Sequence, residues 1–366
     1  MELKIDRETL LKPLQLIIGV VEKRQTLPIL GNVLIKIDGD TLSMTATDLE
    51  IEMVTHIPLE NCGIGETTFP ARKFMDICKA LPDGALINIK VDGERATIRS
   101  GKSRFILSTL PANDFPNIDS FEANTEFTLS QNQLKHLFDK TQFAMAQQDV
   151  RYYLNGLLLE FTQEQIRAVA TDGHRLALCD EQAAVGCSET QQIIVPRKAV
   201  LELSRLLGNS DEPVTFQLGN NHIRLITSEM TFITKLIDGR FPDYQRVVPQ
   251  AGDKLVTADR QTLRQALSRA SILSNEKYRS VRFKFSNNTL QVLAHNPEQE
   301  EAEEDIVVEY NGEILEIGFN ASYVMDALGV IGTDSIIMEL TDQNSCCLIR
   351  SAESQDAKYV VMPMRL

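Results

Sequence analysis

The sequence predicts an α+β fold built from three tandem copies of one domain, each with two helices packed on antiparallel sheet. Two observations predict it. Short motifs recur along the chain at an interval of about 124 residues, which is typical of internal repeats. Each copy also contains two helix-like segments separated by runs in which apolar and polar residues alternate. A length of 366 residues fits two or three domains of ordinary size.

Two kinds of motif mark the copies. The first is a four-residue segment: TATD at 45–48, VATD at 169–172 and, in weaker form, LAHN at 293–296. The second is a longer helix-like segment: PARKFMDICKAL from Pro70, PRKAVLELSRLL from Pro196 and NASYVMDALGVI from Asn320. From this spacing we expect domains at 1–122, 123–249 and 250–366.

Apolar residues at helical spacing predict six helices, two in each copy. Their expected ranges are 6–21, 70–81, 130–146, 196–207, 259–274 and 320–331. The first helix of each copy follows Asp6, Ser130 or Asp259, whose side-chain oxygen suits the free N–H groups of a first helical turn. Ser130 and Gln133 also have the spacing of a capping box.

Alternating residues between the helices predict antiparallel strands with one buried face. In the first copy they occupy 31–57, around the turn-forming sequence DGD, and 85–110, where Asp92-Gly93 suits a hairpin turn. The later sequence RSGKSRF contains the GKS of a phosphate-binding loop. Ala96 stands where such a loop needs glycine, and strand-like residues flank it, so we expect another hairpin.

Charge is distributed unevenly along the chain. Its net charge is −14, which taken alone argues against nucleic acid. The six predicted helices together carry about +6, so the rest of the chain carries about −20. Solvated faces of amphipathic helices would explain any one basic helix. Five neutral or basic helices in an acidic chain instead favour a surface that holds phosphates without reading sequence.

Several classes of protein are not indicated. The charged N-terminus MELKIDRETLLKPL is unlike a signal peptide, and no apolar run is long enough for a membrane, so we expect a cytoplasmic protein. His174 and Asp172 lack a neighbouring nucleophile, so no catalytic residue is predicted. The five histidines and six cysteines show no metal-ligand spacing, so no metal or other cofactor is predicted. The cysteines are expected to be reduced thiols: Cys62, Cys78, Cys179, Cys187, Cys346 and Cys347.

Six longer blocks resemble one family, the bacterial DNA polymerase sliding clamp, which is the beta subunit of the replicative DNA polymerase. The blocks are TLPILGN (26–32), DVRYYLNG (149–156), ATDGHRLAL (170–178), DGRFPDY (238–244), LSNEKYR (273–279) and YVVMPMRL (359–366). The resemblance runs over the whole chain. It implies a processivity factor with no catalytic site of its own, which encircles duplex DNA without sequence specificity.

The resemblance also implies an assembly and a set of partners. The assembly is a head-to-tail homodimer whose six domains close a ring with helices inside. Twelve helices spaced about 9 Å apart trace a circle about 34 Å across, which leaves about 24 Å for a duplex. The implied partners are the clamp loader, the replicative and translesion DNA polymerases and repair proteins. An adaptor that binds proteins without encircling DNA is the alternative.

Three sets of site residues follow from the resemblance. Residues implied to face DNA are Arg24, Arg72, Lys73, Gln148, Tyr152, Tyr153, Arg197 and Lys198. A groove for a short linear motif of partner proteins is implied at Leu154, Thr171, Gly173, His174, Arg175, Leu176, Pro242, Arg246, Val247, Val360, Val361, Met362, Pro363, Met364 and Arg365. The dimer interface is implied at Phe105, Leu107, Ile272 and Leu273.

Each set has an ordinary alternative. The C-terminal VVMPM is alternatively an edge strand, and any of the DNA-facing residues is alternatively a plain surface residue. Tyr152 and Tyr153 are adjacent, so one can point inward and the other outward. The acidic run from Glu298 to Asp305 lies near the implied dimer seam, where Lys73 and Lys102 or Arg104 could pair with it, or it is a solvated loop. Metal binding is a third and weaker alternative, since nothing in the run fixes a ligand geometry.

Overall fold

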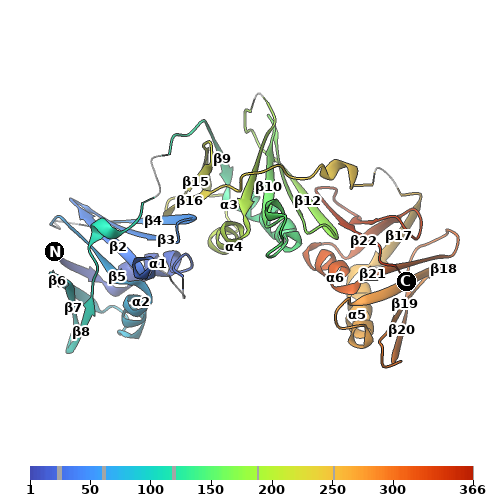
Figure 1. The fold of residues 1–366 in the computed structure, drawn as a ribbon, viewed down its shortest axis with the longest axis horizontal. Helices are drawn as coiled ribbons and strands as arrows, with labels where there is room; N and C mark the ends of the chain where they lie inside the picture. Colours follow the sequence, from blue (N-terminus) through green and yellow to red (C-terminus); the bar gives the residue numbers. More distant parts are fainter. Residues whose placement is uncertain (23–26, 60–62, 118–120, 188, 250–251, 366) are drawn as a thin grey trace. The chain divides into compact units, whose positions relative to one another are not determined.

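The computed structural model describes residues 1–22, 27–59, 63–117, 121–187, 189–249 and 252–365, and it contains the same order of elements three times (Figure 1). Each repeat runs strand, helix, three strands, strand, helix, three strands. All six predicted helices are present. The threefold repetition predicted from the motif spacing is therefore confirmed.

The bounds of the elements are as follows. The first repeat has β1 (Glu2–Asp6), α1 (Arg7–Ile17), β2 (Asn32–Asp38), β3 (Thr41–Thr47), β4 (Ile51–Pro58), β5 (Gly65–Pro70), α2 (Ala71–Ala80), β6 (Leu86–Asp92), β7 (Arg95–Ser100) and β8 (Ser103–Ser108), with short 3-10 helices η1 (Pro28–Gly31) and η2 (Ala112–Asp114). The second has β9 (Thr125–Ser130), α3 (Gln131–Thr141), η3 (Gln142–Ala144), η4 (Tyr152–Leu154), β10 (Gly156–Phe161), β11 (Gln165–Thr171), β12 (Arg175–Gln182), β13 (Gln191–Pro196), α4 (Arg197–Leu206), β14 (Pro213–Leu218), β15 (His222–Ile226), β16 (Met230–Lys235) and η5 (Tyr244–Arg246).

The third repeat completes the chain. It has β17 (Lys254–Asp259), α5 (Arg260–Ala270), η6 (Ser271–Leu273), β18 (Ser280–Ser286), β19 (Thr289–His295), β20 (Glu301–Val307), β21 (Leu315–Asn320), α6 (Ala321–Val330), β22 (Ser335–Leu340), β23 (Cys347–Ser351) and β24 (Ala357–Val361). The first helix of the second and third repeats ends earlier than predicted. Its last turn is the separate 3-10 helix η3 or η6.

Two eight-stranded antiparallel sheets join neighbouring repeats. In one, β4 of the first repeat pairs with β16 of the second; in the other, β12 of the second pairs with β24 of the third. The chain accordingly forms two compact units, one of residues 1–132 with 205–236 and one of residues 133–204 with 237–366. Each unit contains one of these sheets and one four-stranded sheet.

The two four-stranded sheets belong to the first and third repeats, and neither pairs with a strand of another repeat. Their strand orders are β1-β6-β7-β8 and β20-β19-β18-β21, so β8 and β20 are edge strands. The run RSGKSRF forms the turn between β7 and β8, with Gly101 at φ +54°, as predicted for a hairpin. The interpretation of the acidic run as a solvated loop was wrong for residues 301–305, which lie in β20, whereas residues 298–300 belong to the turn before this strand.

Helices pack on the sheets through one apolar face. In α1 the buried residues Leu10, Leu14 and Ile17 recur at helical spacing, and α1 lies against β3, β4 and the neighbouring α2. The pair α5 and α6 packs in the same way in the third repeat (Figure 1). Among the described residues, no helix is long and apolar enough to span a membrane.

The predicted helix caps differ between repeats. Asp259 accepts a hydrogen bond from the Thr262 backbone N–H at 2.7 Å, as predicted. Asp6 makes no such bond, so that prediction was wrong, and the backbone N–H of Arg7 instead donates to the carbonyl of Ala85 at 2.9 Å. The Ser130–Gln133 capping box stays a prediction.

Replacing Asp259 with alanine is expected to destabilise its unit by about 1 kcal/mol, because it leaves a first-turn N–H without its side-chain acceptor. Asp6→Ala is the matched control, since Asp6 precedes the equivalent helix but caps nothing, and its cost should stay below about 0.5 kcal/mol. Urea unfolding of both variants measures the difference. Equal destabilisation would mean that the side-chain cap contributes nothing.

Candidate functional site

A cavity of about 150 Å³ opens where the second and third repeats share a sheet. Its lining comes from η4, the end of β11, β12, the segment that leads into η5, and β24. The lining residues are Arg151, Leu154, Thr171, Gly173, Arg175, Leu176, Pro242, Tyr244, Val247, Val360 and Met362. A cavity with apolar walls and a few polar groups suits short peptides that carry apolar side chains.

The cavity floor is part of a buried apolar cluster. Leu176 of β12 stands directly opposite Val360 of β24, and both are at most 3% exposed. Tyr244 closes one side, and its hydroxyl donates to the Glu160 carboxylate at 3.0 Å. Because β12 and β24 come from different repeats, this cavity exists only when the two repeats share one sheet.

A tight turn between β11 and β12 shapes the rim. The Thr171 hydroxyl donates to the Arg175 carbonyl at 2.6 Å, and the Asp172 carboxylate accepts from the backbone N–H of His174 at 2.9 Å. Gly173 has φ +88°, a conformation that side chains rarely adopt, and a Cβ there would stand 3.0 Å from the Arg151 guanidinium. The turn therefore requires glycine at this position.

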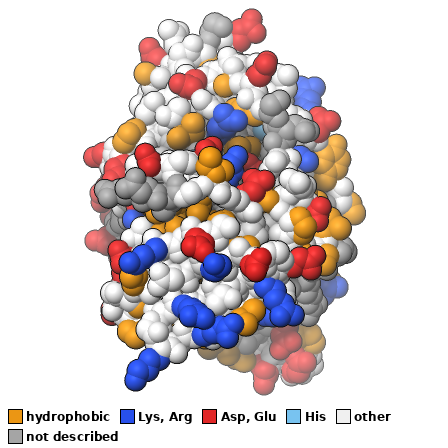
Figure 2. Space-filling model, turned by 90° about the vertical axis from the view of Figure 1, so that its left-hand side faces the viewer, with side chains coloured by type: hydrophobic (Ala, Val, Ile, Leu, Met, Phe, Trp, Pro, Cys, Tyr) orange, Lys and Arg blue, Asp and Glu red, His pale blue; other side chains and the backbone are white. Residues whose placement is uncertain are grey.

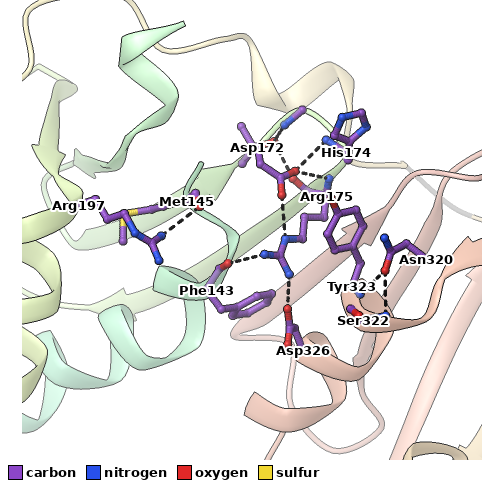
Figure 3. Close-up of polar contacts among 12 residues, drawn as sticks. Phe143, Met145, Asp172, His174, Arg175, Arg197, Asn320, Ser322, Tyr323 and Asp326 are labelled. Carbon is purple, nitrogen blue, oxygen red and sulfur yellow. Dashed lines mark hydrogen bonds and ion pairs between the residues drawn. The ribbon is translucent and has the colours of Figure 1, made fainter. Parts of the chain in front are cut away.

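Arg175 is held from several sides (Figure 3). Its guanidinium donates to the Asp172 carboxylate at 3.0 Å and the Phe143 carbonyl at 2.7 Å, and it also pairs with Asp326 of α6. The ring of Tyr323 lies under it, with the guanidinium carbon 4.6 Å from the ring centroid. Arg175 therefore fixes the second repeat against the third and has little freedom to reorient toward a ligand.

A second hollow, of about 340 Å³, shares Arg175 with the cavity. His174 stacks on Tyr323 here, with ring centroids 6.5 Å apart, and Arg197 donates to the Met145 carbonyl at 3.1 Å (Figure 3). Asp172 is occupied by Arg175 and by backbone donors. The pair His174 and Asp172 is therefore arranged as a structural turn.

The predicted groove residues divide into two groups. Nine of them line the cavity: Leu154, Thr171, Gly173, Arg175, Leu176, Pro242, Val247, Val360 and Met362. Arg151 and Tyr244 also line the cavity but were not among the predicted groove residues, although both lie in blocks that carry the family resemblance, DVRYYLNG and DGRFPDY. Their role could have been suspected from those blocks.

The other six predicted groove residues lie elsewhere. His174 faces the second hollow, and the exposed Arg246 pairs with Asp243 at 2.8 Å. Val361 is buried opposite Arg175 in the β12–β24 pair, and Met364 bonds through its backbone to Gly318 at 2.8 Å. The remaining two follow β24: Pro363, which is half-buried, and Arg365, which is exposed.

The predicted DNA-facing residues fall in both units. In the first, Lys73 is exposed on α2, and Arg72 donates to the Val21 carbonyl at 2.9 Å; Arg24 lies outside the described residues. In the second, Arg197 and Lys198 begin α4 and are half-buried, and Gln148 is exposed with φ +56°. Tyr152 is 57% exposed, whereas Tyr153 packs against the core, so the inward and outward prediction for this pair is confirmed.

The predicted interface residues lie on or beside the edge strands β8 and β20. Phe105 and Leu107 are on β8, and Ile272 and Leu273 are in η6, which contacts β20. Ile272 is 74% exposed, which is high for a large apolar side chain. Lys and Arg side chains gather over the lower part of the face that carries β6–β8 (Figure 2), and the exposed ones include Arg95, Arg99, Lys102 and Arg104.

Comparisons with known proteins agree along the whole chain. Three family models match it: the N-terminal, central and C-terminal domains of the DNA polymerase III beta subunit, over residues 1–119, 128–243 and 245–365. The beta sliding clamps of Pseudomonas aeruginosa and Escherichia coli are 56% and 53% identical to it, with 100% of each chain covered. Crystal structures of DNA polymerase sliding clamps from Pseudomonas aeruginosa (56% identity) and Caulobacter crescentus (38%) align over 100% of each chain, with TM-scores of 0.98 and 0.94.

Proposed function

Because the chain belongs to the DNA polymerase III beta subunit family, we propose that it is a sliding clamp: a closed ring that encircles duplex DNA and tethers the replicative polymerase. The observation that carries the proposal is the complementarity of two edge strands, β8 and β20. The proposed domain boundaries are 1–122, 123–249 and 250–366. The proposed location is the cytoplasm, where replication takes place in bacteria.

The internal junctions indicate how a ring would close. At both junctions the last strand of one repeat, β16 or β24, pairs with the fourth strand of the repeat before it, β4 or β12. In the part of the chain that the structure describes, only β8, the last strand of the first repeat, and β20, the fourth strand of the third, have no such partner. Pairing β8 with β20 of a second copy would build the same kind of eight-stranded sheet twice and leave neither β8 nor β20 as a free edge.

In each repeat, the first strand and the last three strands lie side by side, and residues that stand directly opposite one another form a row across them. The row begins on the first strand, three residues before the N-cap of the first helix, and ends on the last strand. Residues at the same place in each row are equivalent between repeats. The rows are Leu3, Ile89, Ile98 and Phe105; Phe127, Phe216, Leu225 and Phe232; and Val256, Met338, Ile349 and Tyr359. Phe105 therefore holds the place of two junction aromatics, Phe232 and Tyr359.

The junction register can be transferred to the free edges. Tyr359 stands opposite Ala177 at the second internal junction. Ala177 pairs with Ala170 of β11, and its equivalent Ala302 pairs with Ala294 of β19. In the proposed dimer, Phe105 would therefore stand opposite the partner subunit's Ala302.

This register places opposite charges together. One residue further along, Arg104 would face the partner's Glu303, with the partner's Glu301 on the diagonal. Within its own chain Arg104 stands opposite Arg99. Two like charges in directly opposed positions destabilise a sheet, and acidic residues of the partner would reduce this repulsion. The acidic strand β20 and the basic strand β8 are thus complementary in charge as well as in pairing.

The apolar contact at the seam follows from the same equivalence. Phe143, the middle residue of η3, lies 5.9 Å from the ring of Tyr359 at the second internal junction. Ile272 is the middle residue of η6 and holds the corresponding place beside β20. The exposed Ile272 would accordingly pack on Phe105 of the partner subunit.

The helices would supply the DNA-facing surface. Of the six α-helices found among the described residues, five carry net positive charge, and α6, with Asp326, is negative. Exposed cations such as Lys73 give weak contacts to phosphate that tolerate sliding. The closed ring, and not tight binding, would then provide processivity.

The cavity between the second and third repeats is the proposed docking site for the short linear motifs of partner proteins. Its apolar floor at Leu176 and Val360 and its flexible wall at Met362 can accept related peptides. The proposed partners are the replicative and translesion polymerases, the clamp loader and repair proteins. No catalytic role is proposed, so ATP hydrolysis during loading would belong to the loader.

Loading onto nicked circular plasmid by a competent clamp loader tests the ring directly. The protein is expected to stay on the circle through gel filtration and to be released when the plasmid is linearised. Equal retention on circular and linear DNA would mean ordinary contact binding. Binding to neither, with a loader shown to load another clamp, would favour the protein-binding adaptor.

A further inference from the structure

Three metal-ligating side chains converge on one point of the second unit. They are His136 on α3, Cys179 on β12 and Asp356, the residue before β24. Their candidate ligand atoms, one nitrogen, one sulfur and one oxygen, all lie within 4.8 Å of one another. The Nε2 atom of His136 is 3.6 Å from an Asp356 carboxylate oxygen. The cluster is separate from the partner cavity and from the predicted DNA-facing residues.

The spacing is close to that of a tetrahedral ion site. Zinc binds nitrogen, oxygen and thiolate sulfur at roughly 2.0 to 2.3 Å, which puts neighbouring ligand atoms roughly 3.3 to 3.8 Å apart. The 3.6 Å separation of His136 Nε2 from the Asp356 carboxylate falls in this range. The ligand atoms lie at most 4.8 Å apart, so a contraction of about 1 Å would bring every separation into the range of a tetrahedral zinc site.

A fourth residue orients the histidine. The Glu181 carboxylate lies 2.6 Å from His136 Nδ1, on the side of the ring away from Asp356. A histidine that binds a metal usually donates its other ring N–H to a carboxylate, which fixes the ring and directs the free nitrogen at the ion. Glu181 is placed for this role and leaves Nε2 as the ligand.

An orphaned buried hydroxyl adds an independent observation. Tyr359 is 1% exposed, and its hydroxyl has no hydrogen-bond partner among the described residues. Tyr359 stands opposite Ala177, and Cys179 follows two residues later on the same strand, so the side chains of Tyr359 and Cys179 lie on the same face of the sheet. A buried donor without an acceptor costs free energy, and a metal-bound water would supply the missing partner.

We propose that His136, Cys179 and Asp356 form a Zn²⁺ site, with Glu181 as its positioning residue and water in the fourth position. The mixed nitrogen, sulfur and oxygen set favours zinc over magnesium or calcium, which prefer oxygen alone. The half-exposed side chains of His136 and Asp356 give the ion a route from solvent to the buried Cys179. Binding converts the thiol to a thiolate and releases its proton to solvent.

The ion would join three segments. It would tie α3 and β12 of the second repeat to the start of β24 in the third, where Cys179 stands opposite Ala357. The same strand pair lines the partner cavity at Leu176 and Val360. A zinc ion here would therefore act as a structural clip on the junction that forms that cavity.

Chelator-buffered Zn²⁺ titration of the reduced full-length protein tests the site, with Co²⁺ absorption reporting thiolate coordination. We expect one equivalent of Zn²⁺ per chain, a cobalt–thiolate band and a higher unfolding temperature with zinc. His136→Gln and Cys179→Ala should each weaken binding on the order of 100-fold or more and abolish the band. Glu181→Gln should weaken binding roughly 10- to 100-fold and keep the band.

Matched variants in the first unit provide the controls. Cys78→Ala removes another fully buried thiol and His56→Gln another histidine, and both should bind like the unaltered protein. Equal zinc affinity in His136→Gln and the unaltered protein would overturn the proposal. So would zinc binding without a cobalt–thiolate band, since that would place the ion on surface histidines and carboxylates and leave His136 as a simple ion-pair partner.

Discussion

An Ile272→Asp variant is expected to be monomeric at concentrations where the unaltered protein is a dimer. The substitution places a charge without a partner in the proposed contact with Phe105 of the partner subunit. Burying such a charge costs about 3 to 5 kcal/mol, which is about a 150- to 5000-fold loss of affinity. A head-to-tail dimer contains this contact at both of its interfaces, so one substitution weakens both interfaces. Sedimentation equilibrium measures the change.

Ile314→Asp is the matched control. Ile314 is 70% exposed and Ile272 74%, so either carboxylate is solvated in the monomer and neither change should disturb folding. Ile314 lies outside the proposed seam, and its variant should remain a dimer. Phe105→Asp should reproduce the monomer from the other side. A dimer that tolerates aspartate at both Ile272 and Phe105 would rule out this interface.

A charge exchange tests the strand register separately. Arg104→Glu and Glu303→Arg each set like charges against each other across the proposed seam and should weaken the dimer. The two changes combined restore an opposite-charge pair and should recover most of the affinity. Recovery by the double variant supports the register that Phe105 and Ala302 define. Additive weakening would mean that β8 and β20 meet in another register.

The repeats and their elements could be predicted because their signals are local. A helix such as α1 shows its buried face in the spacing of Leu10, Leu14 and Ile17, and a hairpin shows its turn residues. The pairing of β4 with β16 and of β12 with β24 could not be predicted in this way. Strand pairing over long separations depends on which edges meet in space, and no short stretch of sequence records that.

The same distinction applies to the acidic run and to the proposed metal site. Carboxylates at Glu301, Glu303 and Asp305 suggest a solvated loop, but they occupy the outward positions of an edge strand, where charge prevents unwanted pairing. His136 and Cys179 have no metal-ligand spacing along the chain. The packing of α3 on β12 brings them together, so composition and spacing predicted no metal there.

Within the predicted groove, the resemblance identified the segment correctly but could not separate its faces. In β24 and the residues after it, Val360 and Met362 line the cavity, whereas Val361 and Met364 do not. Side chains alternate along an extended segment, so Val361 faces away from Val360. Met364 is excluded for another reason: its backbone pairs with Gly318, and its side chain is not among the lining residues. The cavity therefore predicts which of two similar methionines contributes to peptide binding.

Removing residues 362–366 is expected to abolish binding of a fluorescent peptide that carries the polymerase's clamp-binding motif, while the dimer persists. The truncation takes away the Met362 wall of the cavity and leaves the β12–β24 pairing intact. Loss of an apolar wall and its backbone support at His174 should weaken binding at least about 100-fold, the range of a central hot spot. Fluorescence anisotropy and sedimentation measure the two properties on the same sample.

Point variants then locate the effect. Met362→Ala removes a cavity-lining side chain and should weaken the peptide about 10-fold or more, since burial of a methionine contributes about 1.5 to 3 kcal/mol. Met364→Ala is the matched control, because Met364 is similarly half-buried but lies beside Gly318 and outside the cavity lining. Its effect should stay within about threefold. Equal losses in the two variants would mean that the peptide runs along the whole C-terminal segment and does not dock mainly in this cavity.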